Sequence, residues 1–149
     1  MDRQKTLAGK GSLTGIGLHT GANSTVTISP APENYGIRFV RTDIEGSPEI
    51  PADIDYIVGN ARGTAIGIGD AIVHTLEHLM AAFAGLGVSN ALVQIDAEEL
   101  PLMDGSAQPF IDLIREIGVK EQEAEQEYIV IDEPMWLYNK DNIALSVFP

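Results

Sequence analysis

Cysteine is absent from the 149 residues of this chain. Its absence excludes a disulfide scaffold and any metal site built from thiolates, so a metal would have to be held by His, Asp or Glu side chains. Long apolar runs are absent too: no segment approaches the roughly 18 residues that a membrane-spanning helix needs, and the polar N-terminus lacks the apolar stretch of a signal peptide. We therefore expect a soluble protein of the cytoplasm with no integral membrane segment.

Basic residues are scarce: the chain has 9 Lys and Arg against 22 Asp and Glu, for a formal net charge of -13. A surface this acidic argues against nucleic acid and anionic membranes as direct partners. The hydrophobic fraction of 44% is ordinary for a globular protein, so the chain can bury a core. Its length predicts one domain, with room for the start of a second.

Several segments predict short strands. Apolar residues alternate over 24–29 and 36–41, which is typical of half-buried strands. Residues 91–96 are apolar enough for a buried strand. Residues 42–70 contain many Asp, Gly and Pro between short apolar islands, so we expect small strands and a surface loop there.

Two segments predict helices. The clearest covers residues 73–86, and its apolar residues at i, i+3, i+4 and i+7 are Leu76, Leu79, Met80 and Phe83. Gly85 or Gly87 should end it, because glycine accepts the left-handed C-cap conformation. A second helix is predicted over residues 107–117, with Ser106 as its N-cap.

These elements predict an α+β fold with a mostly antiparallel sheet and both helices packed on one face. We expect the domain to cover residues 1–120. The Glu-rich run 121–127 is predicted to be an acidic linker. Strands are then expected over 128–132 and 143–147, so residues 128–149 are predicted to open a second domain.

The pentapeptide His74-Thr75-Leu76-Glu77-His78 contains two of the three histidines of the chain. On a helix, His74 and His78 would lie one turn apart with Glu77 beside them. Imidazoles at that spacing can bind one Zn²⁺, and a neighbouring carboxylate can activate a water on the metal. Catalytic zinc usually takes three protein ligands. The candidates for a third ligand are Asp70, Asp96, Glu98, Glu99 and Asp104.

Three interpretations of this motif stay open on spacing alone. The pattern H-x-x-E-H is that of inverted zinc peptidases, in which both histidines are ligands and Glu77 is the base. A zinc hydrolase of another class would use only part of the motif. In the third interpretation these are ordinary solvated side chains of a non-catalytic interaction module.

Three longer stretches carry a resemblance to a known family. They are Gly15–Gly21 (GIGLHTG), Thr75–Leu79 (TLEHL) and Glu99–Phe110 (ELPLMDGSAQPF). In this order and spacing they resemble the UDP-3-O-acyl-N-acetylglucosamine deacetylases of lipid A biosynthesis. Gln4–Leu7 and Asp132–Pro134 are similar to that family as well. The resemblance covers essentially the whole chain, but only about the first half of the usual family length.

The resemblance implies a zinc-dependent amidase that removes acetate from the 2-nitrogen of a UDP-linked, 3-O-acylated glucosamine. His78 matches the first zinc ligand of the family, and Glu77 matches its general base. Thr64, in the Arg62-Gly63-Thr64 loop, matches a loop that lines the substrate site. His19 and Asp104 match motif positions near the site and are expected to have supporting roles.

The same resemblance implies that much of the site lies elsewhere. The other two zinc ligands of the family, a His and an Asp, belong to its second half, as do a lysine and a histidine that help to bind and protonate. His74 stands where the family requires no histidine. We therefore expect this chain to be the first of two similar domains, inactive by itself and a weak zinc binder. Its expected partner is the missing C-terminal domain, which some relatives extend with a fused dehydratase.

Overall fold

The computed structural model describes residues 2–59, 63–139 and 143–149. Its helices are α1 (Glu77–Leu86), α2 (Gln108–Ile117) and the short 3-10 helix η1 (Ile54–Tyr56). Its strands are β1 (Arg3–Leu7), β2 (Gly11–Ile16), β3 (Asn23–Pro30), β4 (Ile37–Arg41), β5 (Glu49–Pro51), β6 (Ile57–Gly59), β7 (Ala65–Ile68), β8 (Ala71–His74), β9 (Ala91–Ile95), β10 (Val119–Glu125), β11 (Met135–Tyr138) and β12 (Ala144–Val147). Within this described part, no helix is both long and apolar enough to cross a bilayer.

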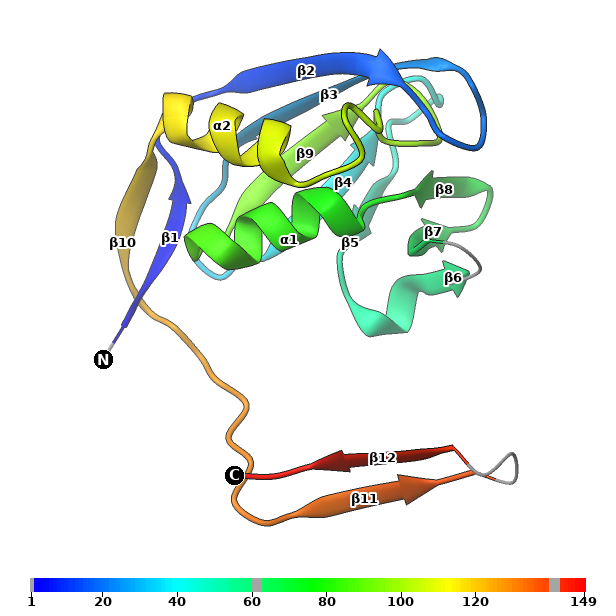
Figure 1. The fold of residues 1–149 in the computed structure, drawn as a ribbon. Helices are drawn as coiled ribbons and strands as arrows, with labels where there is room; N and C mark the ends of the chain where they lie inside the picture. Colours follow the sequence, from blue (N-terminus) through cyan, green and yellow to red (C-terminus); the bar gives the residue numbers. More distant parts are fainter. Residues whose placement is uncertain (1, 60–62, 140–142) are drawn as a thin grey trace.

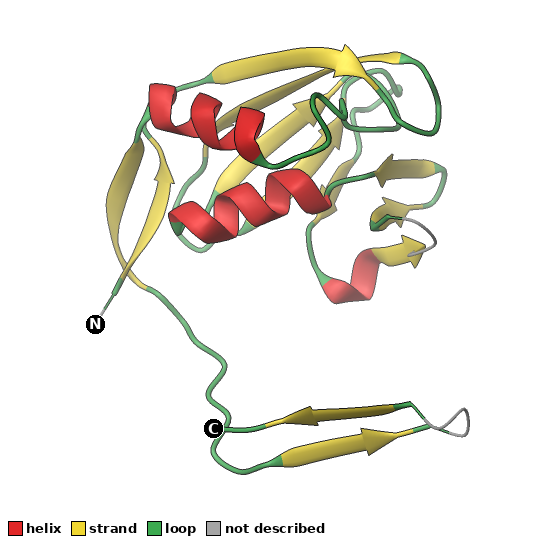
Figure 2. Cartoon of the chain, viewed as in Figure 1, coloured by secondary structure: helices red, strands yellow, loops and turns green. Residues whose placement is uncertain are grey.

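The main sheet has five strands in the order β2-β3-β9-β4-β5. Its neighbours run antiparallel except for β4 and β9, which are parallel. Helices α1 and α2 lie side by side across one face of this sheet (Figure 1, Figure 2). The predicted α+β fold, with a mostly antiparallel sheet and both helices on one face, is confirmed.

The core lies between that face of the sheet and the two helices. Strand β3 alternates as predicted, so that Val26 and Ile28 are fully buried. Phe83 of α1 and Phe110 of α2 enter the same core. The predicted stripe of α1 is confirmed as well, since Leu76, Leu79 and Phe83 are buried and Met80 packs against them. Hydrophobic burial on this scale is the main source of stability of the fold.

The start of α1 corrects the sequence prediction. The predicted helix 73–86 begins only at Glu77, because residues 71–74 form β8 and pair with β7 in a hairpin. Thr75 separates strand from helix with a left-handed φ of 60°. The predicted C-terminal stop is confirmed at Gly87, whose φ of 70° places it in the αL conformation.

Helix α2 begins one residue later than predicted. Its N-cap is Ala107 rather than Ser106. Ser106 still contributes, because its Oγ accepts a hydrogen bond from the N–H of Gln108 at 3.0 Å. The turn before it, from Met103 to Ser106, is present as predicted.

The acidic run 121–127 is not a linker over most of its length. Residues 119–125 form β10, which pairs antiparallel with β1. The glutamate side chains of β10 are exposed, while its backbone pairs with β1. Gln122 points inward and accepts a hydrogen bond from Asn90 at 2.8 Å. The charge pattern is that of an exposed strand, and it gives no indication of the backbone pairing with β1.

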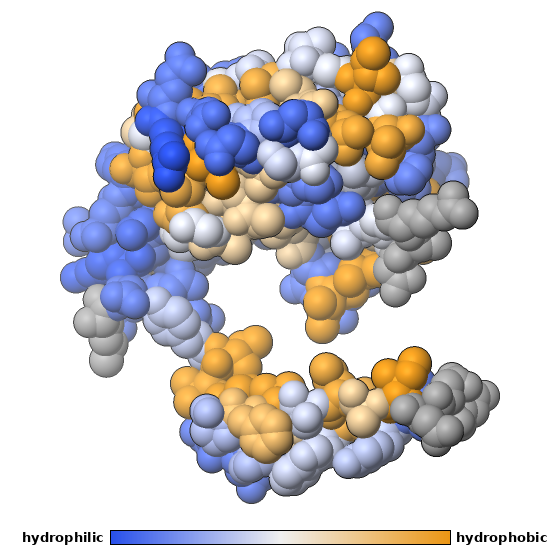
Figure 3. All heavy atoms as spheres, in the orientation of Figure 1, coloured by the Kyte–Doolittle hydropathy of each residue, from blue (hydrophilic) through white to orange (hydrophobic). Residues whose placement is uncertain are grey.

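The segment after β10 contains one hairpin, β11–β12, whose strands pair only with each other among the described residues. The strand predicted over 128–132 is wrong: no neighbouring strand pairs there, and regular structure resumes at Met135. Both strands are exposed throughout, and apolar side chains cover much of the hairpin (Figure 3). That residues 128–149 open a second domain stays a prediction.

Candidate functional site

Helix α1 presents the central pair of the site at its N-terminus. Glu77 is its first residue and His78 its second, and both side chains are half-buried. A carboxylate in the first turn is favoured by the partial positive charge of the helix N-terminus. The helix therefore anchors the backbone of the pair on the core, while both side chains remain partly exposed.

Thr64 is the nearest partner of Glu77. Its N–H donates to Glu77 Oε2 at 3.1 Å, while its carbonyl accepts the N–H of Thr75 at 3.0 Å. Gly63 stands close as well: a Cβ added there would lie 3.3 Å from Glu77 Oε1. Within the described residues, no hydrogen bond involves Glu77 Oε1, so this oxygen is available to a ligand. Arg62, the first residue of the predicted loop, lies outside the described residues.

Asp104 lies on the turn that faces His78. The hydroxyl and the N–H of Ser106 hold the pKa of the Asp104 carboxyl below its usual value, and the charge of His78 lowers it further. Leu102, just before the turn, donates its N–H to the carbonyl of Ile16 at 3.0 Å and so joins the turn to β2. The structure thus brings Asp104 close enough to His78 for their charges to interact.

His19 lies in the loop between β2 and β3, with its side chain exposed. Its backbone is fixed, because its N–H donates to both carboxylate oxygens of Glu99, at 3.1 and 3.0 Å. Glu99 also accepts the hydroxyl of Thr75 at 2.8 Å, two residues before Glu77. One carboxylate therefore holds both the His19 loop and the approach to α1.

Glu99 is the residue that sequence reasoning missed. It was only one of five candidate acidic ligands, but its side chain is 1% exposed. Burial alone would raise the pKa of Glu99. The N–H groups of Thr20 and His19 and the hydroxyls of Thr75 and Thr20 outweigh burial and lower this pKa to about 2. Both oxygens of Glu99 are occupied by these donors, so neither is left to bind a metal.

The placement of His74 removes the geometry of the H-x-x-E-H motif. His74 is the last residue of β8, and Thr75 with its left-handed φ lies between it and α1. The two histidines are therefore not one turn apart on a helix. The expectation that His74 and His78 share one helix face is wrong, and the peptidase interpretation loses its structural basis.

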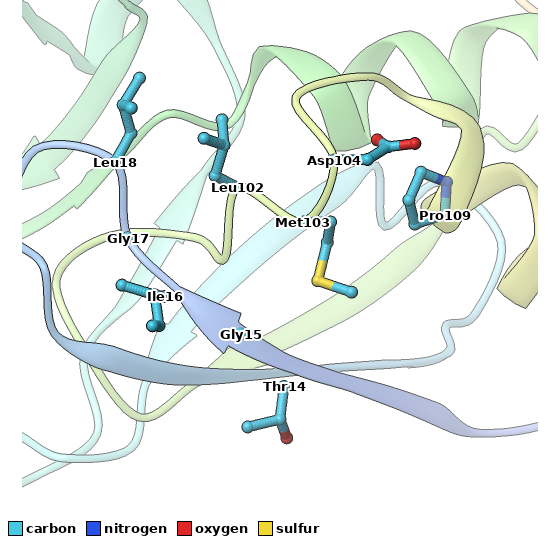
Figure 4. Close-up of a pocket in the computed structure, with 9 residues that line it drawn as sticks. All are labelled: Thr14, Gly15, Ile16, Gly17, Leu18, Leu102, Met103, Asp104 and Pro109. Atoms are coloured by element: carbon cyan, nitrogen blue, oxygen red, sulfur yellow. The ribbon is translucent and has the colours of Figure 1, made fainter.

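Two pockets flank the site. The first lies between the end of β2 and the 102–104 turn (Figure 4), and its lining residues are Thr14, Gly15, Ile16, Gly17, Leu18, Leu102, Met103, Asp104 and Pro109. The second is more apolar, includes Thr64 and Glu77, and is completed by Ala52, Asp53, Ile54, Ile57, Ile66, Leu76 and Met80. Glu77 thus has an apolar groove beside it.

A metal could find only part of a site here. Over the described residues, no three His, Asp or Glu side chains gather closely enough to hold an ion. His78 is accessible and is the one imidazole next to Glu77. Because catalytic zinc usually takes three protein ligands, the residues present fit one ligand and need others from elsewhere.

Comparison with known proteins identifies the family. The sequence profile of "LpxC: UDP-3-O-acyl N-acetylglycosamine deacetylase" matches residues 4–149. The chain is 43% identical to the UDP-3-O-acyl-N-acetylglucosamine deacetylase of Anaeromyxobacter sp. (strain Fw109-5), over 95% of this chain and 46% of that protein. It is 47% identical to the enzyme of the same name from Myxococcus xanthus, over 95% of this chain and 45% of that protein.

A further relative is longer. The chain is 49% identical to the bifunctional enzyme LpxC/FabZ of Chlorobaculum tepidum, over 93% of this chain and 30% of that protein. The chain thus spans half or less of the length of the curated relatives that it matches. The match over nearly every residue shows that this chain belongs to the UDP-3-O-acyl-N-acetylglucosamine deacetylase family.

Proposed function

We propose that this chain supplies one side of the active site of a zinc-dependent deacetylase. The enzyme would hydrolyse the N-acetyl amide of a UDP-3-O-acyl-N-acetylglucosamine in lipid A biosynthesis. The observation that supports this most is the pair Glu77–His78 at the start of α1, with Glu77 held by the N–H of Thr64. The names of the relatives supply the reaction class and the substrate.

His78 would provide one zinc ligand, and the remaining ligands would come from the second half of a full-length enzyme. Zinc, when bound, polarises a carbonyl and makes a water more acidic. Asp104 stands on the His78 side of the site, and its lowered pKa keeps it negatively charged. Its charge would favour a cation beside His78.

Glu77 would act as the general base. Thr64 fixes Oε2 of the carboxylate, and no hydrogen bond of the described residues engages Oε1. This oxygen would accept the proton of the attacking water, and the leaving nitrogen would be protonated with help from the second half of the enzyme. Thr64 would thus orient the base and also line the substrate site, while His19 and Asp104 would support the substrate from the other loops.

A second domain of similar topology is part of this proposal. Its helices would pack against α1 and α2, so that the site is completed at the seam. In the full-length polypeptide the enzyme would work in the cytoplasm, with or without a fused dehydratase as in the bifunctional relatives. This chain alone would be inactive, because His78 has no second and third zinc ligand beside it among the described residues.

The direct test is acetate release from UDP-3-O-acyl-N-acetylglucosamine by the full-length polypeptide that carries this chain. Glu77→Gln should lower kcat by about 10²- to 10⁴-fold, the usual contribution of general acid–base catalysis, and leave zinc content unchanged. Glu98→Gln removes an exposed carboxylate nearby and should leave kcat unchanged. Near wild-type turnover of Glu77→Gln would show that the assigned base is wrong. If neither the wild type nor either variant releases acetate, the interpretation as a non-catalytic module is favoured.

A further inference from the structure

Glu99 is a buried negative charge that the proposed reaction does not use. Its side chain is 1% exposed, and neither ion pair in the described part of the chain includes it. Burying an unpaired carboxylate is costly unless hydrogen bonds replace its water. Glu99 lies between the loop that carries His19 and the segment before α1, and it hydrogen-bonds to both.

We propose that Glu99 is a positioning residue that locks the Gly17–Gly21 loop and the entry to α1 into one arrangement, and so fixes His19 relative to Glu77 and His78. The inference rests on the proposed function, because it assigns a task within the same site.

The loop side of this lock uses three donors from two residues. The N–H of His19 reaches both oxygens of Glu99, and the N–H and hydroxyl of Thr20 reach Oε2 at 2.8 and 2.9 Å. Gly17 allows this close approach, because a Cβ there would lie 2.5 Å from Oε2. The loop is therefore wrapped around the carboxylate, which replaces much of the water that the charge would have had.

The helix side runs through Thr75 and Thr64. The hydroxyl of Thr75 donates to Glu99 Oε1 at 2.8 Å and helps to hold Thr75 at a φ of 60°, which a β-branched residue rarely adopts. In this conformation the N–H of Thr75 points to the carbonyl of Thr64, and the N–H of Thr64 holds Glu77 Oε2. An unbroken series of hydrogen bonds thus links Glu99 to the proposed base.

Glutamine at position 99 cannot reproduce this arrangement. Its side-chain amide has nearly the shape of the carboxylate, but one oxygen is replaced by an NH₂ group that donates. Whichever way the amide turns, NH₂ faces the N–H of His19, and either Thr20 or Thr75 loses its acceptor. The substitution therefore tests the contacts while it leaves the volume unchanged.

The experiment compares three variants of the full-length polypeptide by acetate release per folded molecule. Glu99→Gln should lower kcat by about 30- to 100-fold, as expected when a catalytic group is displaced by about 1 Å, with KM changed less than about threefold. Thr75→Val removes only the hydroxyl and should lower kcat in the same direction, while Thr75→Ser keeps it and should restore most of the activity.

Asn90→Ala is the matched control for a loss of stability. Asn90 is 1% exposed and hydrogen-bonds Gln4 and Gln122 at the opposite end of β9 from Glu99. It should lower Tm without changing kcat per folded molecule. If Glu99→Gln lowers Tm but keeps wild-type kcat, as this control does, Glu99 is only structural and the proposal is overturned.

Amide hydrogen exchange separates this proposal from the proposed function. The amides of His19, Thr20 and Thr64 should exchange faster in Glu99→Gln than in wild type, and should be unaffected in Asn90→Ala. If the wild type releases no acetate, the deacetylase assignment fails while the exchange result still decides the positioning role. Unchanged exchange at all three amides would overturn the proposal even in an active enzyme.

Discussion

Acid should remove about 3 kcal/mol of folding stability from this domain through Glu99 alone. In the folded protein the pKa of Glu99 is about 2, against an ordinary value of 4.5. Each pKa unit corresponds to about 1.4 kcal/mol, so a gap of about 2.5 corresponds to about 3 kcal/mol. Because the pKa is lower in the folded state, the unfolded chain takes up the proton first.

The sign and the pH window follow from these two values. The stabilisation is fully present above pH 4.5, and it falls as the pH drops through 4.5 toward 2. Linkage gives a loss of about 1 kcal/mol at pH 4 and about 2 kcal/mol at pH 3. Glu99→Gln has no such carboxylate, so it starts less stable at pH 7 and loses less as the pH is lowered.

Urea unfolding of wild type and Glu99→Gln between pH 7 and pH 3 measures this directly. The difference between their free energies of unfolding should shrink by about 2 kcal/mol over that range. Glu98→Gln controls for the removal of one exposed carboxylate, and its difference from wild type should stay nearly constant. Parallel curves for wild type and Glu99→Gln would refute the reasoning, since they would mean that the buried carboxylate does not favour the folded state.

Three further predictions concern the core, the end of α1 and the histidines. Phe83→Ala should cost about 3–5 kcal/mol in urea unfolding, because Phe83 is 1% exposed in the core; a cost under about 1 kcal/mol would contradict this packing. Gly85→Ala meets open space and should stabilise by about 0.5–1 kcal/mol, whereas Gly87→Ala should destabilise by about 1 kcal/mol because its φ is 70°; effects of the same sign would count against the observed C-cap. In the full-length polypeptide, His78→Ala should lose zinc measured by metal analysis while His74→Ala keeps it, and loss of zinc from both variants would restore the peptidase interpretation.

Periodicity predicted the interior of α1 but could not locate its start. The 3.6-residue pattern from Leu76 to Phe83 reflects burial on the core, and that part is confirmed. Residues 71–73 are apolar too, and the pairing of residues 71–74 with β7 depends on a partner strand that a window of this segment does not contain. A left-handed Thr75 has no sequence signal, because threonine avoids that conformation unless its surroundings impose it.

Strand β10 was missed for a related reason. Its glutamates at alternate positions are typical of a solvated run, and the inward contacts of Gln122 join it to Asn90, 32 residues away, and to Ala31, 91 residues away. The hydrogen-bonded pairing with β1 joins the two ends of the domain, so no local sequence pattern predicts it. Pairing between strands more than 100 residues apart depends on the tertiary fold and cannot be predicted from a local sequence pattern.

The site divides in the same way. Glu77 and His78 could be singled out because they are adjacent and polar beside an apolar stripe. The hydrogen bond from Thr64 could not, since it joins a loop to a helix 13 residues away. The contacts of Glu99 could not be predicted either, because its partners His19 and Thr20 are about 80 residues distant.

Zinc-dependent acetate release by the full-length polypeptide tests the central claim most directly. The protein would be stripped with a chelator, assayed on UDP-3-O-acyl-N-acetylglucosamine, and assayed again after zinc is returned. We predict that turnover disappears without the metal, returns with zinc in the wild type, and does not return in His78→Ala. Full turnover after chelation, or recovery of His78→Ala to the wild-type rate, would contradict the assignment of a zinc deacetylase site to the start of α1.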